Sequence, residues 1–95
     1  MPELAGAVNV LLVTSPGCHY CDDALQLLEE IGEATPLRVR TVPLSSEEGR
    51  ALLVRHRVAF PPILLVDGDY FGFGRISRRR LERHLARRAM DPAEV

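Results

Sequence analysis

The residues best suited to chemistry in this chain are its two cysteines, Cys18 and Cys21, which are separated by His19 and Tyr20. A pair at this spacing can form a short-range disulfide, supply half of a metal site, or pack as two small core residues. We read no export signal before the pair, so we expect a reducing, cytoplasmic location. In that environment a C-x-x-C pair is more often redox-active or metal-binding than a structural crosslink.

The pair stands where the sequence changes from a strand pattern to a helix pattern. Residues 7–14 form a short valine-rich apolar run, which predicts a strand buried on both faces. The following apolar positions predict one helical face: Cys21, Leu25, Leu28 and Gly32. Cys18 is therefore expected in the first helical turn, where unpaired backbone N–H groups favour an anion and can lower the usual thiol pKa of about 8.5. We predict Cys18 as the nucleophile and Cys21, on the apolar face, as the resolving thiol.

Each of the two residues between the cysteines has two possible roles. His19 either donates a hydrogen bond to the thiolate or is a solvent-exposed loop residue, and Tyr20 either lines the approach of the substrate or is purely structural. Asp22 and Asp23 suit the start of a helix, but their charge disfavours a thiolate nearby.

The rest of the chain predicts an alternation of strands and helices in the order β-α-β-α-β-β-α. The first β-α-β should be a parallel unit, and the Asp67-Gly68 pair predicts a tight hairpin turn. A capping box of Ser45 with Glu48 predicts the start of the second helix. The remaining segments are a half-exposed edge strand at 37–42, a helix ending near 56, hairpin strands at 63–66 and 69–73, and a last helix from a Ser77 cap to about 90.

Two sequence stretches, "PGCHYC" and "PPILLVDGDYFG", resemble the glutaredoxin branch of the thioredoxin superfamily. The resemblance covers roughly residues 7–90, because the predicted order of elements matches as well. It implies an α/β, thioredoxin-like (glutaredoxin-type) fold in one domain, residues 1–95, with a four-stranded mixed sheet flanked by helices. It also implies a thiol–disulfide oxidoreductase that reduces disulfides in proteins or small molecules.

The resemblance further implies a cis-proline packed against the dithiol, at Pro61 or Pro62. Counting back from the hairpin turn favours Pro62. Pro61 then stands where the family uses a backbone N–H to hold the incoming peptide or glutathione, and proline has no N–H. The acids expected after the last strand are replaced by arginines, among which Arg75 or Arg78 is expected to bind a carboxylate of the substrate. Glutathione as co-substrate and a thioredoxin-type reductase remain alternatives for recycling, and no tightly bound cofactor is expected.

The charge of the chain is uneven. Its net charge is −1 and all 12 basic residues are arginines, seven of which lie from residue 75 onward. These arginines form either a solvated helix face or a docking site for an anionic partner. We expect a monomer without nucleic-acid or membrane association, because no nucleic-acid motif and no run of about 18 apolar residues occurs. Two other functions stay open, namely a metal or iron–sulfur module shared across a dimer and a redox-inert adaptor that uses the arginine-rich helix.

Overall fold

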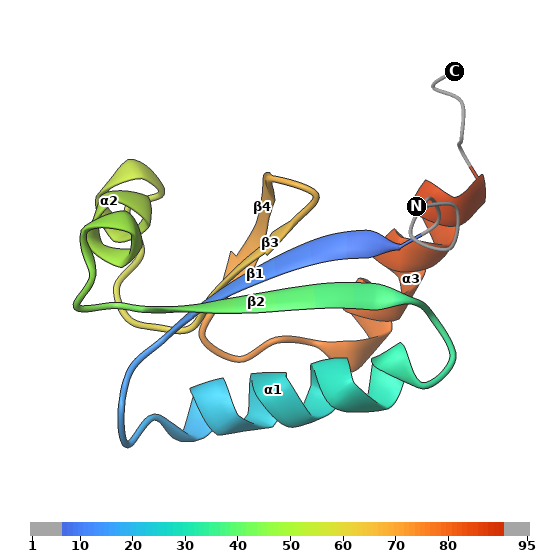
Figure 1. Ribbon diagram of the computed structural model, residues 1–95, viewed down its shortest axis with the longest axis horizontal. Helices are drawn as coiled ribbons and strands as arrows, with labels where there is room; N and C mark the ends of the chain where they lie inside the picture. The colour runs from blue at the N-terminus through green and yellow to red at the C-terminus, as the bar shows by residue number, and fades with distance from the viewer. Residues whose placement is uncertain (1–6, 91–95) are drawn as a thin grey trace.

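A computed structural model describes residues 7–90, which form a four-stranded sheet with three helices (Figure 1). The elements are β1 (Val8–Thr14), α1 (His19–Gly32), β2 (Leu37–Pro43), α2 (Glu47–Arg55), β3 (Ile63–Val66), β4 (Asp69–Phe73) and α3 (Arg78–Met90). The strands lie in the order β2-β1-β3-β4. Because β1 pairs with β2 in parallel and β3 pairs with both neighbours antiparallel, the predicted mixed sheet and element order are confirmed.

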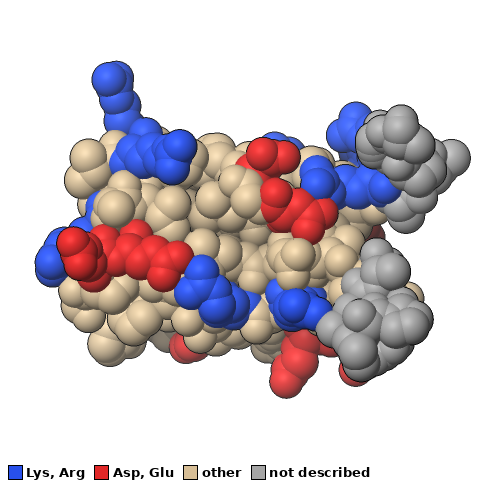
Figure 2. Space-filling view, turned by 45° about the horizontal axis from the view of Figure 1, so that its top comes forward, with Lys and Arg blue, Asp and Glu red and all other residues tan. Residues whose placement is uncertain are grey.

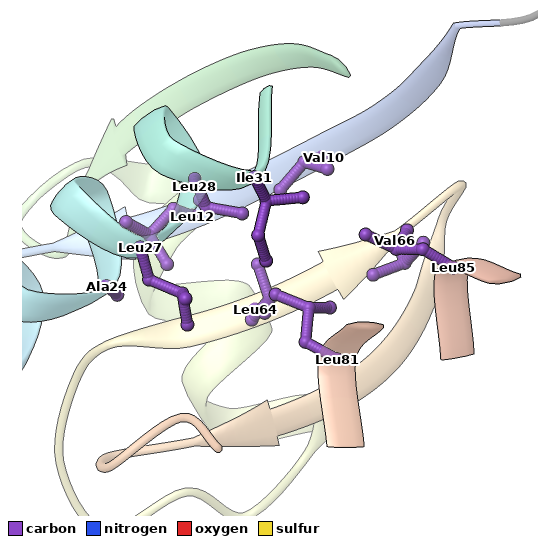
Figure 3. Packing of buried hydrophobic residues seen from close by; sticks show 10 residues of the cluster. All are labelled: Val10, Leu12, Ala24, Leu27, Leu28, Ile31, Leu64, Val66, Leu81 and Leu85. Carbon is purple, nitrogen blue, oxygen red and sulfur yellow. The ribbon is translucent and has the colours of Figure 1, made fainter. Parts of the chain in front are cut away.

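The helices cover the two faces of the sheet unequally. Figure 1 shows α1 on one side of the sheet and α2 on the other. The larger core cluster lies between the sheet and the pair α1 and α3, where the side chains point toward one another (Figure 3): Val10, Leu12, Ala24, Leu27, Leu28, Ile31, Leu64, Val66, Leu81 and Leu85. The smaller cluster lies on the α2 side: Val13, Val58, Ile63 and Leu65. Alternate residues of β1 and β3 thus serve opposite faces, as the pleat requires.

The buried face of α1 differs from the predicted one. Leu25 is 38% exposed and Gly32 is exposed, so these two assignments are wrong. Ala24 and Ile31 are buried in their place, together with Cys21. The residues three and four positions after Cys21 both neighbour it on the helix, on opposite sides. The sheet packs against the side of α1 that carries Ala24, so Ala24 is buried and Leu25 is not. The sequence pattern alone does not distinguish these two sides.

The start of α2 is displaced by one residue from the predicted capping box. Ser46, and not Ser45, caps the helix, because its Oγ accepts the Gly49 N–H at 3.0 Å. Glu48 does not reach back to the cap, since it forms an ion pair with Arg40 on β2, with 2.8 Å between Oε2 and the guanidinium. The predicted capping box is therefore wrong, because its glutamate pairs with an arginine of β2 and its serine is not the N-cap.

The hairpin and the start of α3 agree with the prediction. Asp67 and Gly68 both have positive φ, 50° and 86°, as a tight two-residue turn requires. The turn is tied to its surroundings, because Asp67 accepts a hydrogen bond from the Asn9 N–H at 2.9 Å and pairs with Arg88 of α3 at 2.8 Å. Ser77 caps α3 by accepting the Arg80 N–H at 3.2 Å.

None of the helices within residues 7–90 is long and apolar enough to cross a membrane.

Candidate functional site

Cys18 is the N-cap residue, directly before α1, whereas the sequence predicted it inside the first helical turn. The chain turns after β1 through Gly17, whose φ of 70° suits glycine. Cys18 itself is extended, with φ −102° and ψ 110°, and its Sγ accepts the Cys21 N–H at 3.0 Å. The sulfur thus takes the place that a serine or aspartate oxygen fills at an ordinary helix N-cap. A negative charge on this sulfur would meet a backbone donor and the positive end of the helix dipole.

The two cysteines are joined in a disulfide and differ strongly in exposure. Cys21 is only 2% exposed and faces the core, whereas Cys18 is partly exposed. Only one sulfur of the pair is therefore open to a large partner. This is the difference in exposure that unequal roles require, while the roles themselves stay a prediction.

The loop before β3 packs against the dithiol. The Pro61–Pro62 peptide bond is cis, so Pro62 is the cis residue that the resemblance favoured. Pro62 is buried, and its carbonyl accepts the Gly74 N–H at 2.9 Å. The carbonyl oxygen of Pro61 lies 3.8 Å from the Cys18 Sγ. In the reduced protein this carbonyl is placed to accept a hydrogen bond from the Cys18 thiol.

An open groove of about 580 Å³ surrounds Cys18. Its lining residues come from the β1–α1 turn, the start of α1 and the loop before β3: Ser15, Pro16, Gly17, Cys18, His19, Tyr20, Phe60 and Pro61. No aspartate, glutamate or arginine belongs to this lining. Of the predicted site residues, the groove brings together Cys18, His19, Tyr20 and Pro61.

Phe60 is a site residue that the sequence reasoning missed. Its ring is 47% exposed, stacks on Tyr20 with centroids 6.3 Å apart, and meets the edge of Phe73 at 5.4 Å. Gly74 makes room for it, because a Cβ there would lie 2.9 Å from a Phe60 ring carbon. An aromatic residue directly before Pro61, on the loop that the resemblance places against the dithiol, was the signal that could have identified it.

Two predicted residues are placed differently from the rest. Arg75 is exposed and does not line the groove around Cys18; it borders a separate depression beside Phe73 and Ser77. His19 is exposed in the groove, and within residues 7–90 no hydrogen bond joins its ring to either sulfur. The placement of Arg75 leaves the cysteine groove without the expected cation for a carboxylate.

The described residues contain no cluster suited to a metal ion on one chain. No group of three or more His, Cys, Asp or Glu side chains gathers within residues 7–90. Because zinc takes about four ligands, a metal held by Cys18 and Cys21 would need donors from outside this set.

The arginines of α3, together with Arg75 just before it, divide into two groups. Arg78 pairs with Glu30 of α1 and with Glu82, and Arg88 pairs with Asp67. These arginines tie the helix to the rest of the domain. No carboxylate within residues 7–90 lies at ion-pair distance from the others: Arg75, Arg79, Arg80, Arg83 and Arg87. Figure 2 shows one face of the molecule, on which arginines and acids are interspersed around an uncharged centre.

The comparisons with known proteins agree with this geometry at the level of the fold. No protein-family model and no curated protein matches the sequence. Glutaredoxin 1 from Francisella tularensis, complexed with cacodylate, is 20% identical with a TM-score of 0.53, covering 84% of this chain and 94% of that chain. Trxlp from Edwardsiella tarda is 25% identical with a TM-score of 0.56, covering 87% and 85%. A thioredoxin from Thermus thermophilus is 22% identical with a TM-score of 0.56, covering 90% and 78%.

A C-x-x-C pair in disulfide contact supports a redox role for the site in general. The chain therefore has a thioredoxin-like fold, and the predicted α/β architecture with its four-stranded mixed sheet is confirmed.

Proposed function

We propose that the protein is a thiol–disulfide oxidoreductase that reduces protein disulfides, with Cys18 as nucleophile and Cys21 as resolving thiol. The observation that carries the proposal is the position of the Cys18 sulfur. It sits partly exposed at the helix N-cap with the Cys21 N–H donating to it, while the Cys21 sulfur is buried one turn further on. The accessible sulfur is thus also the one whose thiolate finds a backbone donor.

In the first step the Cys18 thiolate attacks one sulfur of the substrate disulfide. A bond forms between Cys18 and that sulfur, and the other substrate sulfur leaves as a thiolate that takes a proton from water. Cys21 then gives up its proton and attacks Cys18, which releases the second substrate thiol. Two electrons have passed to the substrate, and the Cys18–Cys21 disulfide has formed.

The lining of the groove favours a polypeptide substrate with apolar residues beside its cysteine. The rings of Tyr20 and Phe60 border the sulfur, and no arginine lines the groove to meet the two carboxylates of glutathione. Pro61 offers a carbonyl but no N–H to an incoming peptide. A thiol-class reductant must restore the dithiol, either glutathione or a thioredoxin-type reductase.

Single-cysteine variants test the assignment of roles. The reduced protein is mixed with two fluorescent peptides joined by a disulfide, and the release of peptide is followed. We expect Cys18→Ser to abolish turnover. Cys21→Ser should accumulate one mixed disulfide per chain at Cys18, identified by mass spectrometry and reversed by dithiothreitol. Full turnover by Cys18→Ser, or no mixed disulfide with Cys21→Ser, would sink the proposal.

Further measurements separate the proposal from the two alternatives. A redox-inert adaptor predicts that the oxidised protein is not reduced by glutathione or by a thioredoxin-type reductase system. A metal or iron–sulfur module predicts bound metal and visible absorbance after anaerobic purification. The Cys21→Ser variant exposed to cell extract then identifies the partners that stay linked to Cys18.

A further inference from the structure

A second surface, separate from the cysteine groove, runs between β4 and α3. Two adjoining depressions of about 250 and 220 Å³ lie there, and both are bordered by Tyr70, Phe71 and Arg80. Because β4 is the end strand of the sheet within the described residues, this surface follows an open sheet edge. We refer to the two depressions together as the β4–α3 groove.

The β4–α3 groove carries positive charge that the described part of the chain does not neutralise. Arg75, Arg80, Arg83 and Arg87 border it. None of the four has a carboxylate of residues 7–90 at ion-pair distance, whereas Arg78 and Arg88 of the same helix do. A run of unneutralised arginines on one side of a groove favours an anionic ligand.

The ring of Phe71 lies under the guanidinium of one of these arginines. The Arg80 guanidinium lies 5.0 Å from the centre of the Phe71 ring, and the same ring meets His84 at 5.4 Å. Burial, and then the charges of Arg88 and Arg87, lower the pKa of His84. The arginines therefore supply the positive charge near neutral pH, while the rings supply apolar contact.

The shape of the groove favours an extended chain over a compact ligand. Along α3, Arg80, Arg83 and Arg87 follow one another at about 4.5 and 6 Å. Alternate side chains of an extended peptide are about 6.8 Å apart, a spacing that flexible arginine side chains can meet.

The other face of the same edge is apolar. Tyr70 pairs with Leu65, and Phe73 pairs with Ile63, so both rings lie on the α2 side of the sheet. They are 40% and 38% exposed. A peptide along β4 would therefore meet arginines with one set of alternate residues and aromatic rings with the other.

We propose that the β4–α3 groove binds an extended segment of a partner protein that carries acidic and apolar residues in alternation. The register shift between Leu64 and Leu65 interrupts regular pairing at β4, so side-chain contacts rather than a continuous backbone ladder hold the segment. A second copy of the chain pairing edge to edge would bring arginines against arginines. The proposal does not require an active dithiol, although Phe73 also contacts Phe60 beside Cys18.

Fluorescent ten-residue peptides test the proposal on protein in which both cysteines are serine, so that no disulfide can form. One peptide alternates Glu with Val and Thr, and a second has the same composition with its glutamates in one block. We expect the alternating peptide to bind at least about 10-fold more tightly, measured by fluorescence anisotropy, and its binding to weaken with salt. Replacing Arg80, Arg83 and Arg87 by glutamate should weaken it at least about 10-fold.

The matched control is Arg79→Glu, which changes an arginine of the same helix outside the groove and should leave binding within about twofold. Circular dichroism establishes that the triple variant is folded. The same arginine changes with both cysteines present should leave the reduction of a small disulfide intact, which separates this proposal from the redox function.

Several outcomes would overturn the proposal. Equal binding of the alternating and block peptides would mean unspecific attraction of charge. Tighter binding of inorganic phosphate or of a short oligonucleotide would assign the arginines to another ligand. Self-association of the protein that disappears in the triple variant would make the groove a contact between copies.

Discussion

Replacing Cys18 by alanine or by serine separates two roles of this residue, the chemistry of its sulfur and the capping of α1. Both changes remove the nucleophile, but only alanine removes the side-chain acceptor for the Cys21 N–H, now 3.0 Å from the sulfur. Loss of a good N-cap side chain costs about 0.5–2 kcal/mol. We therefore expect the free energy of unfolding of Cys18→Ala to be about 1 kcal/mol lower than that of Cys18→Ser. For a chain of 95 residues this corresponds to a difference of about 4–8 °C in Tm.

Urea unfolding in reducing buffer, followed by circular dichroism, measures the difference between the two variants. Ser46→Ala is the reference, because Ser46 Oγ caps α2 by accepting the Gly49 N–H, also at 3.0 Å. It should lose a comparable amount relative to the unchanged protein. Equal stability of the two Cys18 variants, within about 0.3 kcal/mol of each other, would refute the cap. It would also remove the argument that the backbone stabilises a thiolate at Cys18.

Three further predictions concern other parts of the domain. Gly49→Ala should destabilise the protein by about 1–2 kcal/mol despite the better helix propensity of alanine, because the new Cβ would overlap the carbonyl of Pro43; urea midpoints measure this, and an unchanged midpoint contradicts it. Phe60→Ala should raise KM for the peptide disulfide about 10-fold with little change in kcat, while Phe60→Leu keeps most of the affinity; a fall in kcat alone would assign Phe60 another role. Burial and nearby arginines lower the pKa of His84 below its usual 6.5, so the unfolded chain binds more protons than the folded one. The free energy of unfolding should therefore fall as the pH drops below about 6.5. His84→Gln should reduce this pH dependence, measured as urea midpoints between about pH 5 and 7.5; an equal pH dependence in the variant contradicts it.

The sequence predicted the elements with local signals most accurately. The hairpin strands, Ile63–Val66 and Asp69–Phe73, have the predicted bounds because the Asp67-Gly68 turn sets the register between them. Ser77 caps α3 as expected. By contrast, Ser45 and Ser46 offer the same side chain one residue apart. Ser46 is the residue that caps α2, while Glu48 forms an ion pair with Arg40 of β2.

The candidate site was predicted in part. The C-x-x-C pair and the loop of Pro61 and Pro62 could be identified because their residue types and spacing are themselves the signal. Phe60 carried a signal in the sequence, because it directly precedes Pro61, but the space that Gly74 leaves for its ring is visible only in the structure. Arg75 was expected to bind a carboxylate of the substrate, but the structure places it at the β4–α3 groove.

By itself, the sequence determined the order of elements, the position of the cysteines at a strand-to-helix junction, and the asymmetry of charge. Short-range patterns suffice for these features, because periodicity, caps and turns depend on neighbours along the chain. The sequence also placed Cys21 on the apolar face of its helix. Only the tertiary structure decided that Phe60 and Tyr20 together border the Cys18 sulfur, and which arginines find acidic partners. These features depend on how segments that are distant in the sequence pack together. Likewise, residues three and four positions apart on a helix have the same chance of being buried until a sheet packs against one side.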